Sequence, residues 1–296
     1  MKVIPSLDDL ALEGAVICIG NFDGVHLGHQ MLLSEMREVA ERTHKPSIVV
    51  TFFPPAKVVF GRGSYLTGRE EKVHLLKAFE PGAVVVTEFS LEYAQTPKEV
   101  FLDELRRVRP SHIIVGEDFR FGHKRSGGLD DLQHVTERLQ VFGLKTLGAE
   151  PIKSSHIRTL LQAGKVEEAK QFLGHSYLAI GEVTGGEKRG RSIGFPTANI
   201  KLPPEKALPL GVFAVQVETP QGTFGGMANV GPRPSFPEEP PSLEVYLFDF
   251  EGDLYGQTLT VSFEHFLRGQ VKFAGLEEVK AQLAEDEKKA RGLLQD

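Results

Sequence analysis

The chain has 296 residues, which suggests two domains, and its 41% hydrophobic and 25% charged residues are typical of a folded globular protein rather than a disordered one. With 34 basic and 40 acidic side chains, the formal net charge of −6 excludes a global basic field for nucleic acid. A single cysteine excludes an internal disulfide framework, an all-cysteine zinc site and iron–sulfur ligation.

Targeting signals are not evident. No stretch approaches the ~18 uninterrupted apolar residues of a membrane-spanning helix. The acidic start MKVIPSLDDL lacks the apolar core of a signal peptide. We therefore expect a cytoplasmic protein that binds neither a membrane nor nucleic acid.

The first part of the chain alternates apolar runs with amphipathic runs. Strands are predicted at 15–20, 47–52, 83–89, 112–116 and 144–149, and helices at 28–43, 69–79, 97–107 and 130–141. Strands that are apolar on nearly every residue are buried on both faces. The pattern predicts an α/β domain over residues 1–176, in which a Rossmann-like parallel sheet carries helices on both sides.

From Tyr177 onward, short strand-like runs dominate and Gly, Pro and Asp separate them. These runs cover 177–183, 212–218, 223–230, 243–250 and 259–266, and a last helix is predicted at 276–294. The pattern predicts a second domain, 177–296, built as an antiparallel β-barrel or sandwich with a terminal helix.

A glycine- and histidine-containing motif links the first strand to the first helix, and it reads Gly20-Asn21-Phe22-Asp23-Gly24-Val25-His26-Leu27-Gly28-His29. In open α/β sheets ligands bind beyond the carboxyl ends of the strands, and a helix N-terminus there attracts phosphate. Two histidines three residues apart share one helix face and can donate to an anionic phosphorus centre. A metal pair or two surface histidines are the alternatives. We expect contacts with a phosphate group from Gly20, Asn21, Phe22, Gly24, His26 and His29.

Two segments of this domain resemble the nucleotidyltransferase superfamily, whose members join a nucleotide to an acceptor phosphate and release pyrophosphate. His26-Leu27-Gly28-His29 resembles its HxGH signature, and Ile152-Lys153-Ser154-Ser155-His156-Ile157-Arg158 resembles its ISSTxxR motif. The resemblance implies that His26 and His29 are catalytic, and that Ser154, Ser155 and Arg158 contact the triphosphate of ATP. Read alone, the second segment would be a capped helix with a solvated arginine.

The second domain contains the glycine-rich segment GGEKRGRSIGFPTANI at 185–200. It approaches a Walker A pattern, but Arg191 replaces the lysine and Pro196 interrupts any following helix. A glycine-rich hairpin is the simplest alternative. The segment Pro196-Thr197-Ala198-Asn199 resembles the PTAN motif of riboflavin kinases. This resemblance implies Mg²⁺ binding by Thr197 and Asn199. It also implies ATP contacts from Gly185, Lys188, Gly190, Arg191, Gly194, Thr197 and Asn199.

Three later segments fit the riboflavin kinases as well, at 208–214, 227–234 and 243–250. The family resemblance makes Glu244, in the last of them, the catalytic base. A carboxylate in that place can accept the proton of the riboflavin 5′-hydroxyl during phosphoryl transfer.

Together the two halves resemble the bacterial bifunctional riboflavin kinase/FAD synthetases. The resemblance implies riboflavin, FMN and ATP as substrates and FMN, FAD, ADP and pyrophosphate as products. It implies Mg²⁺ or another divalent ion, ATP as co-substrate and no tightly bound redox cofactor, and it leaves the oligomeric state open. Flavin contacts are expected from Asp118, Phe119, Phe121 and Arg268, although one of the two phenylalanines is expected in the core.

Two departures from the family pattern stand out. Pro55 takes the place of a usual histidine in TFxPHP, and Gln270 takes the place of an acidic residue two positions after Arg268. Rival interpretations are a cytidylyltransferase or pantetheine-phosphate adenylyltransferase with an accessory barrel, a non-catalytic flavin sensor and a nucleotide-binding scaffold. The PTAN segment and the Glu244 strand argue against the first rival.

Overall fold

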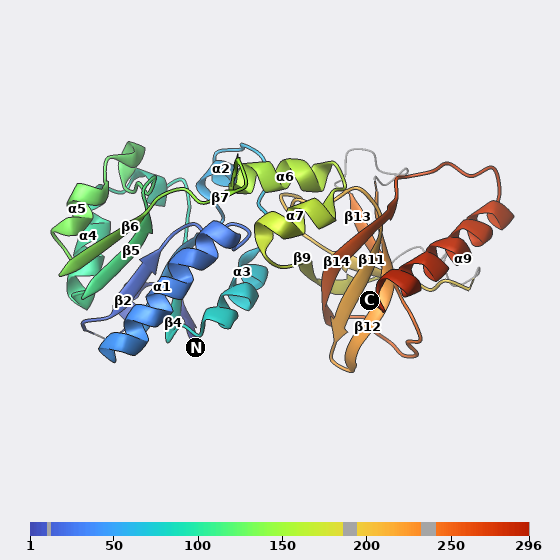
Figure 1. The fold of residues 1–296 in the computed structure, drawn as a ribbon, viewed down its shortest axis with the longest axis horizontal. Helices are drawn as coiled ribbons and strands as arrows, with labels where there is room; N and C mark the ends of the chain where they lie inside the picture. Colours follow the sequence, from blue (N-terminus) through green and yellow to red (C-terminus); the bar gives the residue numbers. More distant parts are fainter. Residues whose placement is uncertain (11–12, 186–193, 232–240, 296) are drawn as a thin grey trace. The chain divides into compact units, whose positions relative to one another are not determined.

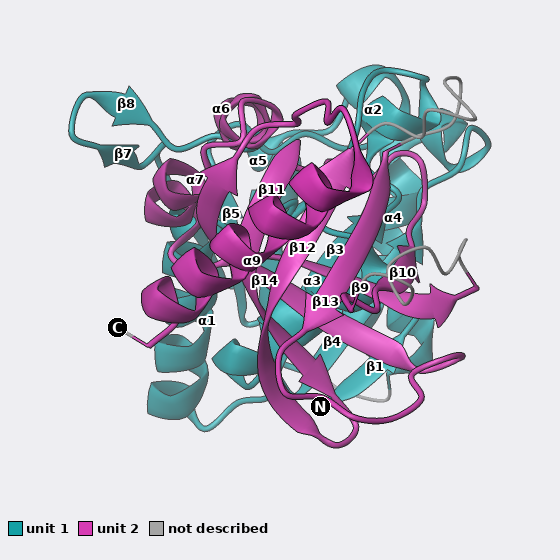
Figure 2. Cartoon of the chain, turned by 90° about the vertical axis from the view of Figure 1, so that its right-hand side faces the viewer, with its two compact units in different colours: residues 1–154 teal, residues 155–296 magenta. Residues whose placement is uncertain are grey.

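The computed structural model describes residues 1–10, 13–185, 194–231 and 241–295. The chain divides into two compact units, residues 1–154 and 155–296 (Figure 2). The units are described one at a time. The expected functional boundary at 176/177 stays a prediction, because two helices lie between it and the boundary of the compact units.

The first unit contains a six-stranded parallel sheet, in the order β1-β4-β3-β2-β5-β6 (Figure 1). Its strands are β1 (Lys2–Ile4), β2 (Val16–Ile19), β3 (Ser47–Phe53), β4 (Ala83–Glu88), β5 (His112–Gly116) and β6 (Arg138–Phe142). The predicted parallel sheet is confirmed, and four of its strands lie where the apolar runs placed them.

Helices cover both faces of this sheet because successive strand residues point to opposite sides. In β2, Ile17 and Ile19 face a core with α4 (Lys98–Val108) and α5 (Leu129–Gln133). Val16 and Cys18 face a second core with α1 (Leu27–Thr43) and α3 (Arg69–Leu76). The unit also contains the short helices α2 (Ala56–Val59), η1 (Leu7–Asp9), η2 (Lys77–Phe79), η3 (Tyr93–Gln95) and η4 (His123–Arg125).

The end of this unit differs from the sequence prediction. The helix expected at 130–141 is confined to α5, and β6 occupies 138–142. The run at 144–149, predicted as a strand of the sheet, is exposed and contributes only β7 (Thr146–Leu147), which pairs with β8 (Glu150–Pro151). An edge strand such as β6 is covered less completely than a central one, so it lacks the continuous apolar run on which the prediction depended.

The order of the strands reverses at one point of the sheet, between β2 and β5. The chain leaves β2 through α1 and adds β3 on one side, whereas after β4 it returns through α4 and adds β5 on the other side of β2. Ligands of open α/β sheets bind at the carboxyl ends of the strands where the order reverses in this way. The histidine motif follows β2 directly, and the segment with Asp118 and Phe119 follows β5.

The second unit is a closed six-stranded antiparallel barrel, in the order β10-β13-β12-β11-β14-β9, so the predicted barrel is confirmed. Its strands are β9 (Tyr177–Thr184), β10 (Ala198–Lys201), β11 (Gly211–Thr219), β12 (Gly222–Gly231), β13 (Ser242–Leu247) and β14 (Thr258–Arg268). β10, which contains the Ala-Asn of PTAN, was not predicted as a strand. Among the described residues that follow the sheet, the helices are α6 (Ser154–Gln162), α7 (Val166–Leu173) and α9 (Leu276–Leu293).

Apolar side chains fill the interior of the barrel, and α9 lies across β11, β12 and β14 on its outer face (Figure 2). Val212, Met227 and Leu267 project outward and form a small core with Ala290 of the helix. Other outward-facing positions of the barrel are not covered by α9. Polar side chains at these positions remain accessible to a ligand.

Candidate active sites

The loop after β2 has a compact backbone that few residues tolerate. Phe22 and Gly24 have φ values of +45° and +91°, in the left-handed region. A Cβ atom on Gly20 would lie 2.8 Å from the Phe22 ring, so only glycine fits there. The Phe22 side chain is fully buried, which leaves the backbone of the loop as the part that meets a ligand.

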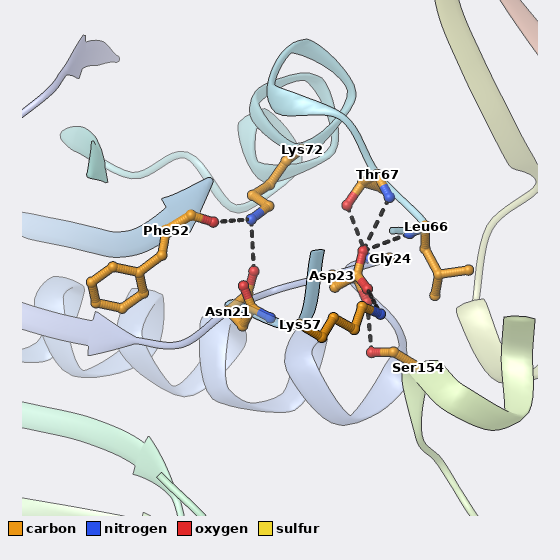
Figure 3. A network of polar contacts seen from close by, with 9 residues as sticks. All are labelled: Asn21, Asp23, Gly24, Phe52, Lys57, Leu66, Thr67, Lys72 and Ser154. Atoms are coloured by element: carbon orange, nitrogen blue, oxygen red, sulfur yellow. Dashed lines mark hydrogen bonds and ion pairs between the residues drawn. The ribbon is translucent and has the colours of Figure 1, made fainter. Parts of the chain in front are cut away.

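Asp23 ties this loop to distant parts of the unit (Figure 3). One carboxylate oxygen accepts hydrogen bonds from the backbone N–H groups of Leu66, at 2.7 Å, and Thr67, at 3.2 Å. The other lies 3.1 Å from the ammonium of Lys57. Asp23 is 2% exposed, so these contacts compensate for the burial of its charge. Neither Asp23 nor Lys57 was predicted as a site residue, although Asp23 lies inside the motif.

Ser154 also contacts the loop. Its hydroxyl donates to the Asp23 carbonyl at 2.9 Å, at the start of α6 (Figure 3). The structure therefore brings Ser154 to the loop of residues 20–26 between β2 and α1, called the histidine loop below. Ser154 and Asp23 are 131 residues apart in the sequence. Ser155 and Arg158 follow on the same helix but belong to the second compact unit. Ser155 is exposed and Arg158 is half-buried.

The two histidines of the motif stack face to face at the start of α1. Their ring centroids are 3.6 Å apart and their planes differ by 13°. His26 is the N-cap of the helix, and its Nδ1 accepts from the backbone N–H of His29 at 3.3 Å. A neutral His26 ring then has its proton on Nε2.

His29 is held in its neutral form. Burial lowers its pKa well below the ordinary histidine value, and the charges of His26 and Lys72 lower it further. Its Nδ1 is buried without a hydrogen-bond partner among the described residues. Buried polar atoms are nearly always paired, so an orphaned ring nitrogen in the first turn of α1 fits a polar ligand atom.

The predicted flavin residues in the segment after β5 differ in how far they are buried. Phe121 is 8% exposed and packs in the core, with its ring 5.2 Å from that of Phe101 and 5.8 Å from that of Phe119. A Cβ atom on Gly127 would lie 2.5 Å from the Phe121 ring. Phe119 is half-buried and Asp118 is exposed. The expectation that one phenylalanine belongs to the core therefore applies to Phe121.

The register of the barrel places two of the predicted kinase residues, Glu244 and Asn199, side by side. Glu244 of β13 is directly opposite Asn199 of β10 on one side and Asn229 of β12 on the other. Facing side chains in such pairs have Cβ atoms about 4.5–5.5 Å apart. Leu243 and Val245 are buried inside the barrel, so Glu244 is on its outer face.

The predicted phosphate loop connects β9 to β10, which pair as the hairpin considered above. Gly185 follows β9, and Gly194 has a φ of +89°. Lys188, Gly190 and Arg191 lie outside the described residues. Thr197 is exposed and immediately precedes β10.

Two of the predicted metal residues carry oxygen atoms of a kind that fits a magnesium ion. A threonine hydroxyl and an asparagine carbonyl, from Thr197 and Asn199, are hard ligands of the kind that Mg²⁺ prefers. Across the described residues there is no group of three or more His, Cys, Asp or Glu side chains that could enclose a metal. This donor set therefore fits an ion that retains water and binds substrate phosphates.

Two side chains at the end of β14 have defined partners. Gln270 donates to the Asn229 side-chain oxygen at 2.9 Å, so the residue that departs from the family pattern lies beside the kinase cluster. Arg268, predicted to contact flavin, pairs with Asp286 of α9, with its Nη2 at 2.8 Å. The guanidinium of Arg268 thus fastens α9 to β14.

Arg268→Met is expected to destabilise the second unit by about 3–5 kcal/mol, because it leaves a buried charge unpaired. Asp286 is only 4% exposed at its side chain. Arg291→Met is the matched control, since its partners Asp249 and Glu287 are 78% and 21% exposed, against 4% for Asp286, so water can reach the carboxylates that lose the contact. Urea unfolding of both variants, followed by far-UV circular dichroism, measures the difference. Equal stabilities would show that the Arg268 pair has no structural role.

Comparisons with known proteins identify a family for each half of the chain. A family model for FAD synthetase matches residues 8–158, and one for riboflavin kinase matches residues 173–294. A protein of Haemophilus influenzae named bifunctional riboflavin kinase/FMN adenylyltransferase is 35% identical, over 95% of this chain and 94% of that protein. A protein of Listeria monocytogenes with the same name is 34% identical, over 93% of this chain and 91% of that protein.

A solved structure is similar throughout. The crystal structure of a Streptococcus pneumoniae protein named a macrolide-efflux protein is 28% identical, with a TM-score of 0.85, and the match covers 98% of this chain and 99% of that one. Within the described ranges, every helix is too short or too polar to cross a membrane.

Proposed function

The chain belongs to the family of bifunctional riboflavin kinase/FMN adenylyltransferases, and we propose which of its residues carry the two reactions. The enzyme phosphorylates riboflavin with ATP to FMN, and then adenylylates FMN with a second ATP to FAD, releasing pyrophosphate. The kinase step belongs to the C-terminal part of the chain and adenylyl transfer to the N-terminal part.

In the N-terminal site, an FMN phosphate oxygen attacks the α-phosphorus of ATP, and the bond to pyrophosphate breaks. The nucleophile is already an anion, so positioning and electrostatic stabilisation suffice. His26 and His29 donate to the charge that develops on the phosphorus centre, and Gly20, Asn21, Phe22 and Gly24 present backbone to the phosphates. Ser154, Ser155 and Arg158 contribute from the start of α6. The orphaned, buried Nδ1 of His29 is the observation that carries this assignment.

On the flavin side of this site, Asp118 and Phe119 contact the ring system, and Phe121 supports Phe119 from the core. Phe119 presents a half-buried aromatic face at the carboxyl end of β5, beside the strand that carries the histidine loop. Aromatic faces of this kind stack on planar ligands.

In the C-terminal site, Glu244 accepts the proton of the riboflavin 5′-hydroxyl, whose oxygen then attacks the γ-phosphorus while ADP leaves. Thr197 and Asn199 hold Mg²⁺, which when bound neutralises charge on the phosphates. Gly185, Lys188, Gly190, Arg191 and Gly194 contact the phosphates from the loop, and Arg268 supports the flavin. The pairing of Glu244 with Asn199 in the barrel register supports this assignment.

Both steps consume ATP, and neither transfers electrons, so the reactions need ATP and a divalent ion and no redox cofactor. We place the enzyme in the cytoplasm, where ATP is available, with small molecules as its partners.

Product analysis tests the function directly. Purified protein incubated with riboflavin, ATP and Mg²⁺ is expected to form FMN first and FAD afterwards, and chelation of the metal is expected to stop FMN formation. Chromatography separates the three flavins. FMN that accumulates without FAD would contradict the N-terminal assignment, and added FMN that becomes FAD without riboflavin turnover would contradict the C-terminal one.

A further inference from the structure

A buried lysine lies beneath the histidine loop. Lys72 of α3 has no exposed surface, although lysine is among the residues least often buried. Its ammonium donates to the carbonyl of Asn21 at 2.7 Å, to the carbonyl of Phe52 at 2.8 Å and to the Thr51 hydroxyl at 3.3 Å. Figure 3 shows the ammonium between the loop and the end of β3. Its three N–H groups thus meet three acceptors, and none of these is a carboxylate.

The contact with Asn21 fixes the orientation of one peptide group. In a trans peptide the C=O and the following N–H point in opposite directions. Because the Asn21 carbonyl points to Lys72, the N–H of Phe22 points away from it. The loop needs such a hold, since Phe22 adopts a φ of +45°, a region that L-residues with bulky side chains rarely occupy.

We propose that Lys72 is a positioning residue for adenylyl transfer, which turns the Phe22 N–H toward the phosphates of ATP and places a positive charge beneath them. The inference rests on the proposed function of the N-terminal site. No contact between Lys72 and substrate is required, because the residue acts through the backbone of the loop and through its field.

A purely structural role would not need the charge. The Thr51 hydroxyl also donates to the Asn21 carbonyl, at 3.2 Å, so one neutral hydrogen bond already holds the loop. A positive charge in this place attracts the anionic substrate. Charge is therefore the property that distinguishes a role in the reaction from a role in folding.

The charge titrates near physiological pH. Burial lowers the pKa of Lys72 to about 8, against the opposing effect of Asp23. The other titratable groups around the loop are His26 at the N-cap of α1, His29 on α1, Lys57 on α2 and Glu71 on α3. Above pH 8 the amine keeps two N–H groups for three acceptors, and the field beneath the loop is lost. Weaker binding of ATP, seen as a raised KM, is the expected result, since bound phosphates favour the ammonium form.

Three variants test the proposal: Lys72→Met, Thr51→Val and the exposed control Lys77→Met. FAD formation from FMN and ATP is measured from about pH 6.5 to about pH 9.5, and riboflavin phosphorylation by the same preparation serves as the internal standard. For the unaltered enzyme we expect KM for ATP to rise about tenfold per pH unit above pH 8. Lys72→Met should lower kcat/KM about 100-fold at pH 7 and remove the pH dependence.

Thr51→Val keeps the shape of the side chain and removes one acceptor of the ammonium, so it should move the pH midpoint downward. This variant decides the question if Lys72→Met does not fold. An unchanged midpoint in Thr51→Val, or an ordinary KM in folded Lys72→Met, would overturn the proposal. Absence of FAD formation by the unaltered chain would instead overturn the proposed function on which it rests.

Discussion

Replacing His29 with alanine is expected to slow FAD formation from FMN by two to three orders of magnitude, that is by about 100- to 1,000-fold, while riboflavin phosphorylation continues. The neutral ring has a buried nitrogen with no hydrogen-bond partner among the described residues, so its removal takes away the hydrogen bond that we propose it makes to the reacting phosphates. Loss of one such preorganised group costs about 100- to 1,000-fold in kcat. Rates of both reactions, measured by chromatography on one preparation, give the comparison.

His134→Ala is the matched control for this variant, because His134 is an exposed histidine of the same unit. It should leave both rates unchanged. His29→Asn separates chemistry from packing, since the His29 ring also contacts Phe22, at 5.3 Å between ring centroids, and asparagine retains a polar side chain. Equal loss of FMN and FAD formation in a folded His29→Ala protein would contradict the division of the two reactions between the two sites.

Replacing Glu244 with glutamine should have the complementary effect, stopping riboflavin phosphorylation while added FMN is still adenylylated. Glutamine keeps the shape of the side chain but cannot accept the hydroxyl proton. Loss of a general base costs about 100- to 10,000-fold in rate. The kinase rate is measured with riboflavin and ATP, and the adenylyltransferase rate with FMN and ATP.

Glu218→Gln is the control, since Glu218 is an exposed glutamate on β11 of the same barrel. Its kinase rate should equal that of the unaltered enzyme. Kinase activity retained in Glu244→Gln would reject Glu244 as the base, and its position opposite Asn199 would then be explained by metal or substrate binding alone.

The parts of the fold that could be predicted are those where burial is complete. β2, β3, β4 and β5 are apolar on both faces and were recognised as runs of apolar residues. β1 and β6 were missed because they form the edges of the sheet. β10 was missed because it has only four residues, two of them polar, and only the barrel register shows them to be a strand.

The candidate sites divide in a similar way. Residues within short motifs, such as His26 and His29, could be located because adjacent residues determine where they lie. Lys72 could not, since nothing in its local sequence indicates that a charged residue of α3 reaches the end of β3. Lys57 lies two residues after Pro55, where the usual family histidine is absent, and only the folded structure shows that it reaches Asp23.

The contacts that hold the histidine loop also determine when it can take shape. Its partners Leu66, Lys72 and Ser154 are 43, 51 and 131 residues further along the chain. Contacts between residues so distant in sequence form late in folding, because the intervening chain must first be ordered. The ribosome therefore has to synthesise the whole first unit before the histidine loop can fold completely, although this loop is among the first segments of the unit to be synthesised.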